Sequence, residues 1–346
     1  NVVVVEKNDY IGGAAVSREL HDGWVYSSCS YVCSMMRQTL HRDLDLGRHG
    51  LLLVPYLGTV NFGNGDERLF SYHDEEAAHL ELKRHSPHDA DAMHRFQTDL
   101  TRYSQLIRKT LLRTPPDPTS FRPRDIRELL FLAKEFWRLG EKEIYEYVRF
   151  FTMSAAEYLD DYFENDLIKA AMASPGIIGT ALGVQSPGSS YVLLHHVMGD
   201  VDGSIGAWGL ARGGMGAISN AIAGAVQEHG GEIRTNAGAQ QILVENRKAV
   251  GVVLENGDEI RARIVVSNLD AKRTFTRIMD KNDLPDGIYE KASNFKIRGS
   301  SGKVNIALSG MPKFSGVPEN RYIARGGQGF TGSLETLERA YDCWKH

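Results

Sequence analysis

The chain carries four consecutive valines at residues 2–5 that lead into an acidic residue, Glu6, and paired glycines follow at Gly12 and Gly13. An uninterrupted apolar run of this kind predicts a parallel strand that is buried on both faces. The 35 glycines among the 346 residues favour a turn-rich α/β fold over a helical bundle. A buried strand that ends in an acid and continues into a double-glycine turn is typical of the second half of a nucleotide site.

Glu6, Gly12 and Gly13 suit different parts of a dinucleotide. A carboxylate at the end of the second strand of a nucleotide-binding unit accepts two hydrogen bonds from the 2′- and 3′-hydroxyls of a ribose. Glycines have no Cβ, so the backbone at these two positions can approach a pyrophosphate closely and offer N–H groups to it. The alternative interpretation is a solvated acid after a core strand, followed by an ordinary turn.

Composition narrows the class of partner. The net charge of −4, from 40 basic and 44 acidic residues, does not favour nucleic acid or an anionic membrane surface as the main partner. No apolar run reaches the roughly 18 residues that a membrane-spanning helix needs. Cys29, Cys33 and Cys343 lack framework spacing, which argues for a reducing compartment and against a disulfide scaffold. We expect Cys29 and Cys33 to be buried apolar side chains, and we expect no metal site.

The middle of the chain is predicted to be helical. Residues 74–112 form the first helical stretch, and a proline-rich connector separates it from the second, at residues 126–163. The first helix of the second stretch is expected to stop at Gly140. Ser154 is a candidate N-cap for the helix that follows.

Residues 206–268 give the clearest pattern. A helix of small residues is opened by three glycines and closed by two more, namely Gly213, Gly214, Gly216, Gly230 and Gly231. A strand over residues 232–237 and a three-stranded meander over residues 240–268 follow, with a type I′ turn expected at Asn256 and Gly257. One more strand is expected near residue 303, and a hairpin around Asn64-Gly65.

The stretch EKNDYIGG and the later block GGMGAISNAIAGAVQEHGGEIRTNAGAQQILVENRKAVGVVLENGDEIRARIVVSN carry a family resemblance. Together they resemble the phytoene desaturase and flavin amine oxidase superfamily, and the likeness covers nearly the whole chain. The resemblance implies an α/β fold in which a Rossmann-like FAD-binding domain of the two-dinucleotide-binding type is joined to a mixed α+β substrate domain. FAD is the implied cofactor.

The resemblance also implies roles for particular residues. Glu6 would hold the adenosine ribose of FAD, and Gly12 and Gly13 would line the pyrophosphate and ribitol. Ala239 would contact adenine through its backbone. Lys303 resembles the lysine that flavin amine oxidases hold, through a water, near flavin N5, where it would act on reduced flavin or during reoxidation. The alternative for Lys303 is a strand-end lysine in solvent.

The sequence departs from the family pattern at three places. Ala14 stands where relatives often carry an arginine, so a charged contact to the phosphates is missing. The glycine-rich loop that should precede residue 1 and the late flavin segment are both absent. We therefore expect the chain to be a fragment with an incomplete FAD-binding domain at residues 1–72 and 206–275, and an incomplete substrate domain at residues 73–205 and 276–346.

The expected activity is FAD-dependent removal of a hydride from a C–H or C–N bond of a small substrate that is apolar or bears an amine. The electron acceptor would be oxygen, a quinone or another molecule, and the compartment would be the bacterial cytoplasm or the mitochondrial matrix. Two alternatives stay open. One is a carotenoid or isoprenoid desaturase in peripheral contact with a membrane, through an apolar patch around residues 126–163. The other is a non-enzymatic regulatory protein. The oligomeric state is not predicted.

Two further motifs are set aside. GQGFTG at residues 327–332 matches the dinucleotide pattern, but the run before it is too short for the required strand and no acid follows at the required distance. We expect a loop before a helix capped at Ser333. His195 and His196 lie on a predicted apolar helix over residues 187–199. Adjacent side chains on a helix point to different faces, so we expect one packed and one hydrogen-bonded histidine.

Overall fold

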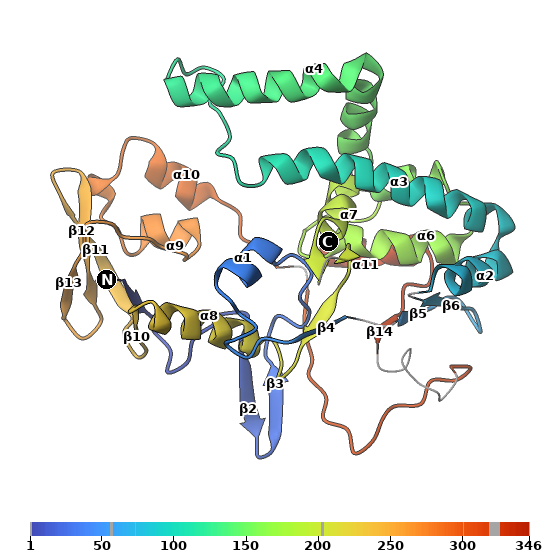
Figure 1. Ribbon diagram of the computed structural model, residues 1–346, viewed down its shortest axis with the longest axis horizontal. Coiled ribbons are helices and arrows are strands. Elements are labelled where there is room, and N and C mark those ends of the chain that lie inside the picture. Colours follow the sequence, from blue (N-terminus) through green and yellow to red (C-terminus); the bar gives the residue numbers. More distant parts are fainter. Residues whose placement is uncertain are drawn as a thin grey trace. The chain divides into compact units, whose positions relative to one another are not determined.

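The computed structural model describes residues 2–55, 58–72, 74–201, 204–299, 301–317 and 326–345. The chain divides into two compact units (Figure 1). The first holds Asn1–Tyr31, Thr39–Leu52 and Ala211–Arg298, and the second holds Val32–Gln38, Leu53–Leu210 and Gly299–His346. These bounds differ from the predicted domains. Residues 32–38, 53–72 and 206–210 of the predicted cofactor domain lie in the second unit, and residues 276–298 of the predicted substrate domain lie in the first. The division into a cofactor domain and a substrate domain stays a prediction.

The first unit is built around two strands from distant parts of the chain. Strand β1 (Val3–Val5) pairs in parallel with β10 (Glu232–Arg234), with Val4 opposite Ile233. Helix α8 (Gly216–Glu228) leads directly into β10. The remaining elements are β2 (Ser17–His21), β3 (Trp24–Ser27), nearly all of α1 (Gln38–Asp43), β11 (Ala239–Glu245), β12 (Lys248–Leu254), β13 (Glu259–Arg261), α9 (Ala271–Thr276), the 3₁₀ helix η2 (Lys281–Asp283) and α10 (Ile288–Asn294).

The prediction of a strand at the start of the chain is confirmed, but the prediction that it is buried on both faces is wrong. Val4 keeps 40% of its surface exposed, and Val3 is exposed as well. Within the described residues β1 pairs only with β10, in a two-stranded sheet. A sheet of two strands offers too little apolar surface to be covered on both sides.

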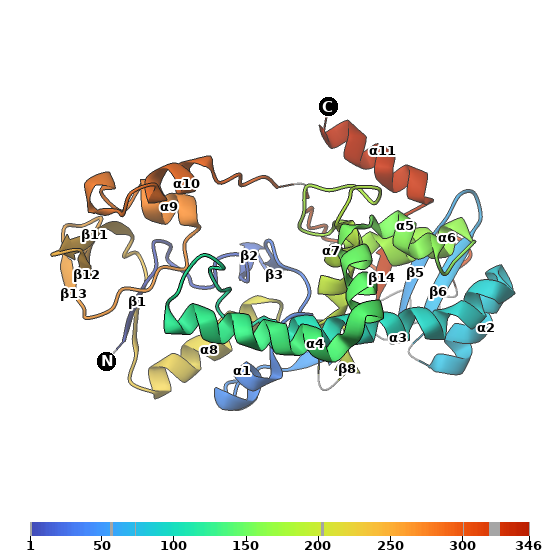
Figure 2. The same cartoon turned by 90° about the horizontal axis from the view of Figure 1, so that it is seen from above.

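The second unit is mostly helical, and Figure 2 shows its helices from above. Its core is aromatic: Tyr103 stacks on Phe150, and Phe150 meets the edge of Tyr158. Its helices are α2 (Glu75–His85), α3 (Pro87–Thr110), α4 (Pro123–Thr152), α5 (Ala155–Asp160), α6 (Asp166–Ala173), η1 (Ser174–Ile177), α7 (Ser189–Val197) and α11 (Leu334–Lys345). Its strands are β4 (Leu53–Pro55), β5 (Gly58–Phe62), β6 (Arg68–Tyr72), β7 (Asp200–Val201), β8 (Ser204–Ile205), most of β9 (Gly209–Ala211) and β14 (Gly327–Gly329).

Most of the predicted helix boundaries are confirmed. Gly140 has φ 78° and ψ 168°, so α4 is broken there and bends sharply before it continues (Figures 1 and 2). Ser154 caps α5 in a capping box with Glu157, each side chain accepting from the backbone N–H of the other residue. Ser333 accepts from the N–H of Thr336 and caps α11.

The turn predictions are confirmed in part. The hairpin at Asn64-Gly65 joins β5 to β6. The type I′ turn is not at residues 256–257, because only Gly257 of that pair has a positive φ. It lies at Asn246 and Arg247, whose φ values are 49° and 62°, between β11 and β12.

Three local predictions are wrong. Residues 301–310 form no strand, and Val304 is 82% exposed, because within the described residues no strand lies beside this segment. The first glycines of GQGFTG form β14, which pairs in parallel with β5, and are not a loop. Cys29 is exposed, whereas Cys33 is buried as predicted.

Asp89 joins the start of α3 to the segment before α6. Its buried carboxylate accepts from the backbone N–H groups of Glu164 (2.9 Å) and Asn165 (3.0 Å). Burial alone raises the pKa of a carboxyl group. Here the hydrogen bonds from His88 and from these two N–H groups outweigh burial and lower the pKa of Asp89.

We predict that Asp89→Ala lowers the free energy of unfolding by about 2–4 kcal/mol, because two buried N–H donors lose their acceptor. Asp91→Ala, at an exposed position of the same helix, is the control and should cost less than about 0.5 kcal/mol. Urea unfolding measures both. Because the folded-state pKa of Asp89 is lowered, its contribution is complete above the ordinary pKa of 3.8 and is lost as the pH falls through the lowered value. Equal stabilities of the two variants at pH 7 would contradict the prediction.

Candidate cofactor site in the first unit

The backbone of Glu6 is fixed on both sides by the segment that contains β10. Its N–H donates to the carbonyl oxygen of Arg234 (2.9 Å), and its own carbonyl oxygen accepts from the N–H of Ala237 (2.8 Å). Parallel pairing thus extends beyond the last residue of β1. Glu6 stands at the carboxyl ends of two parallel strands, the edge of an α/β sheet where ligands bind.

The carboxylate of Glu6 is held by Asn8. Both the backbone N–H and the side-chain Nδ2 of Asn8 donate to the same oxygen, Oε1 of Glu6, each at 2.8 Å. The ammonium of Lys7 points to Glu255 (2.7 Å). The side chain of Glu6 is only half-buried, so its carboxylate can accept further hydrogen bonds from a ligand.

Gly12 and Gly13 form a tight turn, and each of the two positions favours glycine for a different reason. Gly12 has φ 111°, and a Cβ there would lie 2.5 Å from the carbonyl oxygen of Ala15 and 2.8 Å from Oγ of Ser219. Gly13 has φ 54° and open space where its Cβ would be. Within the described residues no hydrogen bond uses the N–H groups of Gly13 or Ala14, so both can be offered to a ligand.

Serine side chains fix the start of α8 against this turn. Helix α8 has no side-chain N-cap of its own. Ser27 Oγ accepts from the N–H of Met215 (3.0 Å), and Ser17 Oγ accepts from the N–H of Gly216 (2.9 Å). Ser219 Oγ donates to the carbonyl oxygen of Ala15 (2.7 Å). The β2–β3 hairpin therefore satisfies donors that a helix start leaves unpaired.

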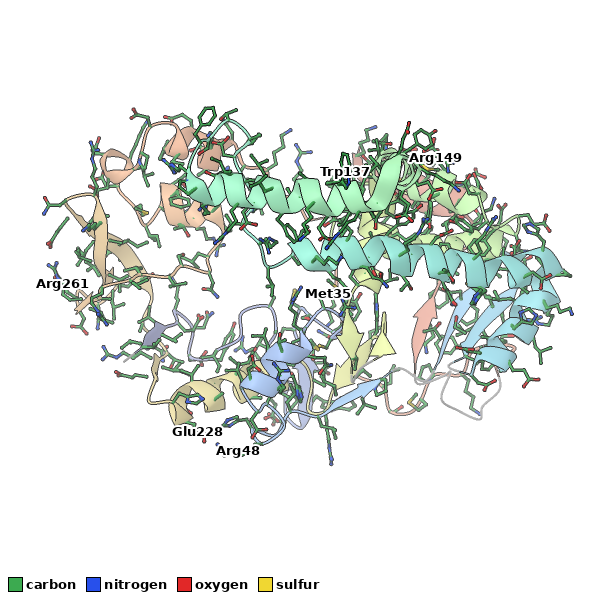
Figure 3. The ribbon with its side chains drawn as sticks, turned by 45° about the horizontal axis from the view of Figure 1, so that its top comes forward. Met35, Arg48, Trp137, Arg149, Glu228 and Arg261 are labelled. Carbon is green, nitrogen blue, oxygen red and sulfur yellow. The ribbon has the colours of Figure 1, made fainter. Side chains whose placement is uncertain are left out.

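The far end of α8 is anchored by charge. Glu228, its last residue, pairs with Arg48, and Figure 3 shows these two side chains together. His49 Nε2 lies 3.0 Å from the second oxygen of Glu228. The helix is thus tied at both ends to segments that come much earlier in the chain, which holds its first turn in place.

Ala239 is brought to the same region. Asn236 donates from its N–H to the carbonyl oxygen of Asn8 (2.9 Å), and Ala237 donates to Glu6 as described above. Ala239 follows two residues later as the first residue of β11, opposite Leu254. The structure therefore gathers Glu6 and the chain that leads into Ala239, while the contact of Ala239 with adenine stays a prediction.

Over residues 1–346 the sequence matches the family described as Flavin containing amine oxidoreductase. The chain belongs to this family. The predicted resemblance to flavin amine oxidases is therefore confirmed.

Individual relatives match most of this chain over only part of their own length. Pyridine nucleotide-disulfide oxidoreductase domain-containing protein 2 from Mus musculus is 33% identical over 334 residues, which cover 92% of this chain and 57% of that protein. Phytoene desaturase (neurosporene-forming) from Rhodobacter capsulatus is 26% identical over 246 residues, which cover 70% and 42%. This chain spans about half the length of these curated relatives.

The fold has a counterpart among solved structures. A crystal structure of a Pyrococcus furiosus protein matches with a TM-score of 0.51 at 13% identity, covering 86% of this chain and 59% of the other. The mixed α/β fold class is confirmed. The finer assignment, an incomplete Rossmann-like domain of the two-dinucleotide-binding type, stays a prediction.

The residues of the first unit fit the flavin dinucleotide that this family implies. Gly12 leaves no room for a side chain at the turn, and Gly13 leaves open space beside two available N–H groups. Glu6 adds a fixed acceptor suited to ribose hydroxyls. Ala14 supplies no cation, so contact with a pyrophosphate at this turn would be made by backbone N–H groups.

Lys303 is placed differently from the other predicted residues. It belongs to the second unit and lies exposed on an extended segment outside any helix or strand. Glu6, Gly12, Gly13 and Ala239 all belong to the first unit. The contact of Lys303 with flavin stays a prediction.

Other clusters of polar side chains have structural partners. The rings of His195 and His196 stand at 86°, and His196 Nδ1 lies 3.0 Å from the carbonyl oxygen of Val192. Burial, helped by the neighbouring His196, lowers the pKa of His195. In the second unit a cavity of about 590 Å³ has charged walls, but Arg84 pairs with Glu81 and Arg68 with Asp66.

The sequence reasoning missed Asn8, Ser17, Ser27 and Ser219. One signal for the serines was available, since a helix opened by glycines has no capping side chain and must find acceptors for its first N–H groups elsewhere. Which residues supply them depends on the packing of a hairpin far from the helix in sequence. Asn8 carries a weaker signal, because an amide two residues after an acid can bond it locally.

We predict that Gly12→Ala lowers the free energy of unfolding by about 2–4 kcal/mol, since the new methyl group meets the Ala15 carbonyl at an unfavourable φ. Gly13→Ala is the matched control and should cost only about 1–2 kcal/mol, because it meets a strained φ and no neighbour. Thermal unfolding without cofactor measures both. An equal loss in the two variants would show that the close approach at Gly12 is unimportant.

Proposed function

We propose that the protein binds FAD through its first unit and removes a hydride from a C–H or C–N bond of a substrate that is apolar or bears an amine. The electrons would pass to oxygen, a quinone or another acceptor. The observation that supports this most is that one unit holds the Glu6 carboxylate at the end of β1 and packs the Gly12–Gly13 turn against α8. Membership of the flavin amine oxidoreductase family supports the reaction class.

Each residue has a defined part in this proposal. Glu6 accepts hydrogen bonds from the adenosine ribose, and the N–H groups of Gly13 and Ala14 face the pyrophosphate. Ala239 meets adenine through its backbone. Lys303 holds a water near flavin N5 or stabilises negative charge on the reduced flavin ring. The bound flavin supplies hydride acceptance, so the protein itself needs to bind, orient and shield the reactants rather than to provide a nucleophile.

We predict that Glu6→Ala weakens FAD binding about 10- to 100-fold, since hydrogen bonds to a charged group are lost. The protein expressed from its whole coding sequence should show a flavin absorption band, and titration with FAD gives the dissociation constants. Glu245→Ala is the control, because Glu245 is an exposed acid at the end of β11 that pairs with Arg261.

Two outcomes would contradict this proposal. An unchanged affinity in Glu6→Ala would remove Glu6 as the ribose ligand. The absence of a flavin band, even after FAD is added, would favour a regulatory protein that keeps the fold without the cofactor. If flavin is bound, anaerobic bleaching by amines, acyl chains or carotenoids identifies the substrate class.

A second candidate is a desaturase that meets an isoprenoid substrate at a membrane surface, and the outward face of α4 favours it. Ile126, Leu130 and Trp137 share one face of the helix before its break, and Leu130 and Trp137 are 66% and 88% exposed. Trp137 is labelled on α4 in Figure 3. None of the described helices combines the length and the apolar character of a membrane span. The contact proposed for this face is a peripheral one.

Two acids of α4 lie on its inward face, whereas cations such as Arg127 and Arg138 are exposed. Glu128 is buried and pairs with Arg113 (2.7 Å), and Glu135 is buried and pairs with Lys109 (2.7 Å). These cations lower the pKa of both carboxyl groups. The exposed apolar side chains of this helix, flanked by cations, are suited to the polar–apolar boundary of a membrane.

We predict that the double variant Leu130→Ser/Trp137→Ser binds vesicles of phosphatidylcholine and phosphatidylglycerol at least about tenfold more weakly than the unaltered protein, because two apolar side chains no longer insert. Vesicle cosedimentation measures the binding. Leu80→Ser, which removes an exposed leucine of α2, is the control. If the unaltered protein does not sediment with vesicles, peripheral membrane contact is excluded.

A further inference from the structure

We propose that Asn8 is a positioning residue that orients the Glu6 carboxylate, so that a single oxygen, Oε2, receives both hydroxyls of the adenosine ribose. This inference rests on the proposed FAD site and adds a residue to which the sequence reasoning assigned no role. The observation behind it is the pair of hydrogen bonds from Asn8 to the carboxylate of Glu6.

The two hydrogen bonds from Asn8 converge on one atom. The backbone N–H and Nδ2 both lie 2.8 Å from Oε1 of Glu6. A carboxylate oxygen offers two lone-pair sites, so Asn8 occupies the hydrogen-bonding capacity of Oε1. No residue in the described part of the chain donates a hydrogen bond to Oε2, which therefore keeps both of its sites. A ribose diol has two O–H donors, which matches this remaining capacity.

Asn8 is itself held in place by the segment that follows β10. Its carbonyl oxygen accepts from the N–H of Asn236 (2.9 Å), next to the bond from Ala237 to Glu6 (2.8 Å). Asn236 adopts φ 51°, a conformation that asparagine accepts more readily than most residues. The backbone of the segment that follows β10 therefore fixes both Asn8 and the residue that Asn8 orients.

The ammonium of Lys7 does not compete with a ligand for the Glu6 carboxylate. Lys7 lies between Glu6 and Asn8 in sequence, but its ammonium is 2.7 Å from Glu255. Asn8 orients the carboxylate with neutral donors, which leaves the negative charge of Glu6 available to strengthen the bonds from a ligand. A flexible glutamate would have to give up rotamer freedom on binding, and a glutamate already fixed loses less.

The experiment is a double-mutant cycle on FAD affinity, with the unaltered protein, Asn8→Ala, Glu6→Ala and the double variant. Quenching of flavin fluorescence gives each dissociation constant. We expect Asn8→Ala to weaken FAD binding roughly fivefold to tenfold, and to have no further effect when Glu6 is already alanine. Both variants lose the Nδ2 donor, and Asn8→Asp should bind FAD more weakly than Asn8→Ala because it also places a like charge beside Glu6.

FMN is the control ligand, because it lacks the adenosine ribose. We expect Asn8→Ala to leave FMN affinity and the thermal unfolding of the cofactor-free protein unchanged. A general structural role for Asn8 would alter both, and either change would overturn the inference.

The cycle separates the two proposals. If Glu6→Ala weakens FAD binding but Asn8→Ala has no effect, or if the two effects multiply in the double variant, the role of Asn8 is wrong and the FAD site stands. If Glu6→Ala leaves FAD affinity unchanged, the ribose assignment of the proposed function fails, and the inference about Asn8 fails with it.

Discussion

The parallel pairing of β1 with β10 brings together parts of the chain that are far apart in sequence, and the candidate site depends on it. Val3–Val5 pair with Glu232–Arg234, and the bonds continue through Glu6 to Ala237 and Asn8 to Asn236. The carboxylate, the glycine turn and the start of β11 take their positions from this pairing. The hydrogen bonds run between main-chain groups, so they fix geometry with little dependence on the side chains of these residues.

Helix α8 transmits this constraint to the glycine turn. Its end leads into β10, and its start is fixed by Ser17 and Ser27 from the β2–β3 hairpin. Ser219 then holds the carbonyl of Ala15, beside the position where Gly12 must lack a side chain. The turn is thus shaped by three segments at once, which explains how a loop without regular structure can keep a defined form for a ligand.

Local signals allowed part of this structure to be predicted from sequence. Ser154 and Ser333 were recognisable as caps, Gly140 as a break and Asn64-Gly65 as a hairpin, because each acts through its own neighbours in the chain. Residues 301–310 alternate like a strand but have no described strand beside them. The burial of Val4 could not be predicted for a similar reason, since it depends on how many strands the sheet has and not on the local sequence.

Within the site, residue type and spacing identified Glu6, Gly12 and Gly13 as candidates, because their chemistry suits a nucleotide whatever surrounds them. Asn8 and the serines could not be found in this way, since their partners are fixed by tertiary packing. The predicted type I′ turn was assigned to Asn256-Gly257 by its composition, yet Asn246 and Arg247 adopt it. There the short connection between β11 and β12 outweighs residue preference.

The separation between β1 and β10 also sets an order of events during synthesis. Residues 3–13 leave the ribosome long before residues 215–239. The Glu6 carboxylate and the glycine turn therefore have no partners while the helical middle of the chain is synthesised. Pairings this distant form slowly, and the valines of β1 offer an apolar strand edge to other chains in the meantime. Completion of β10 therefore ends the period in which this strand is most exposed to aggregation.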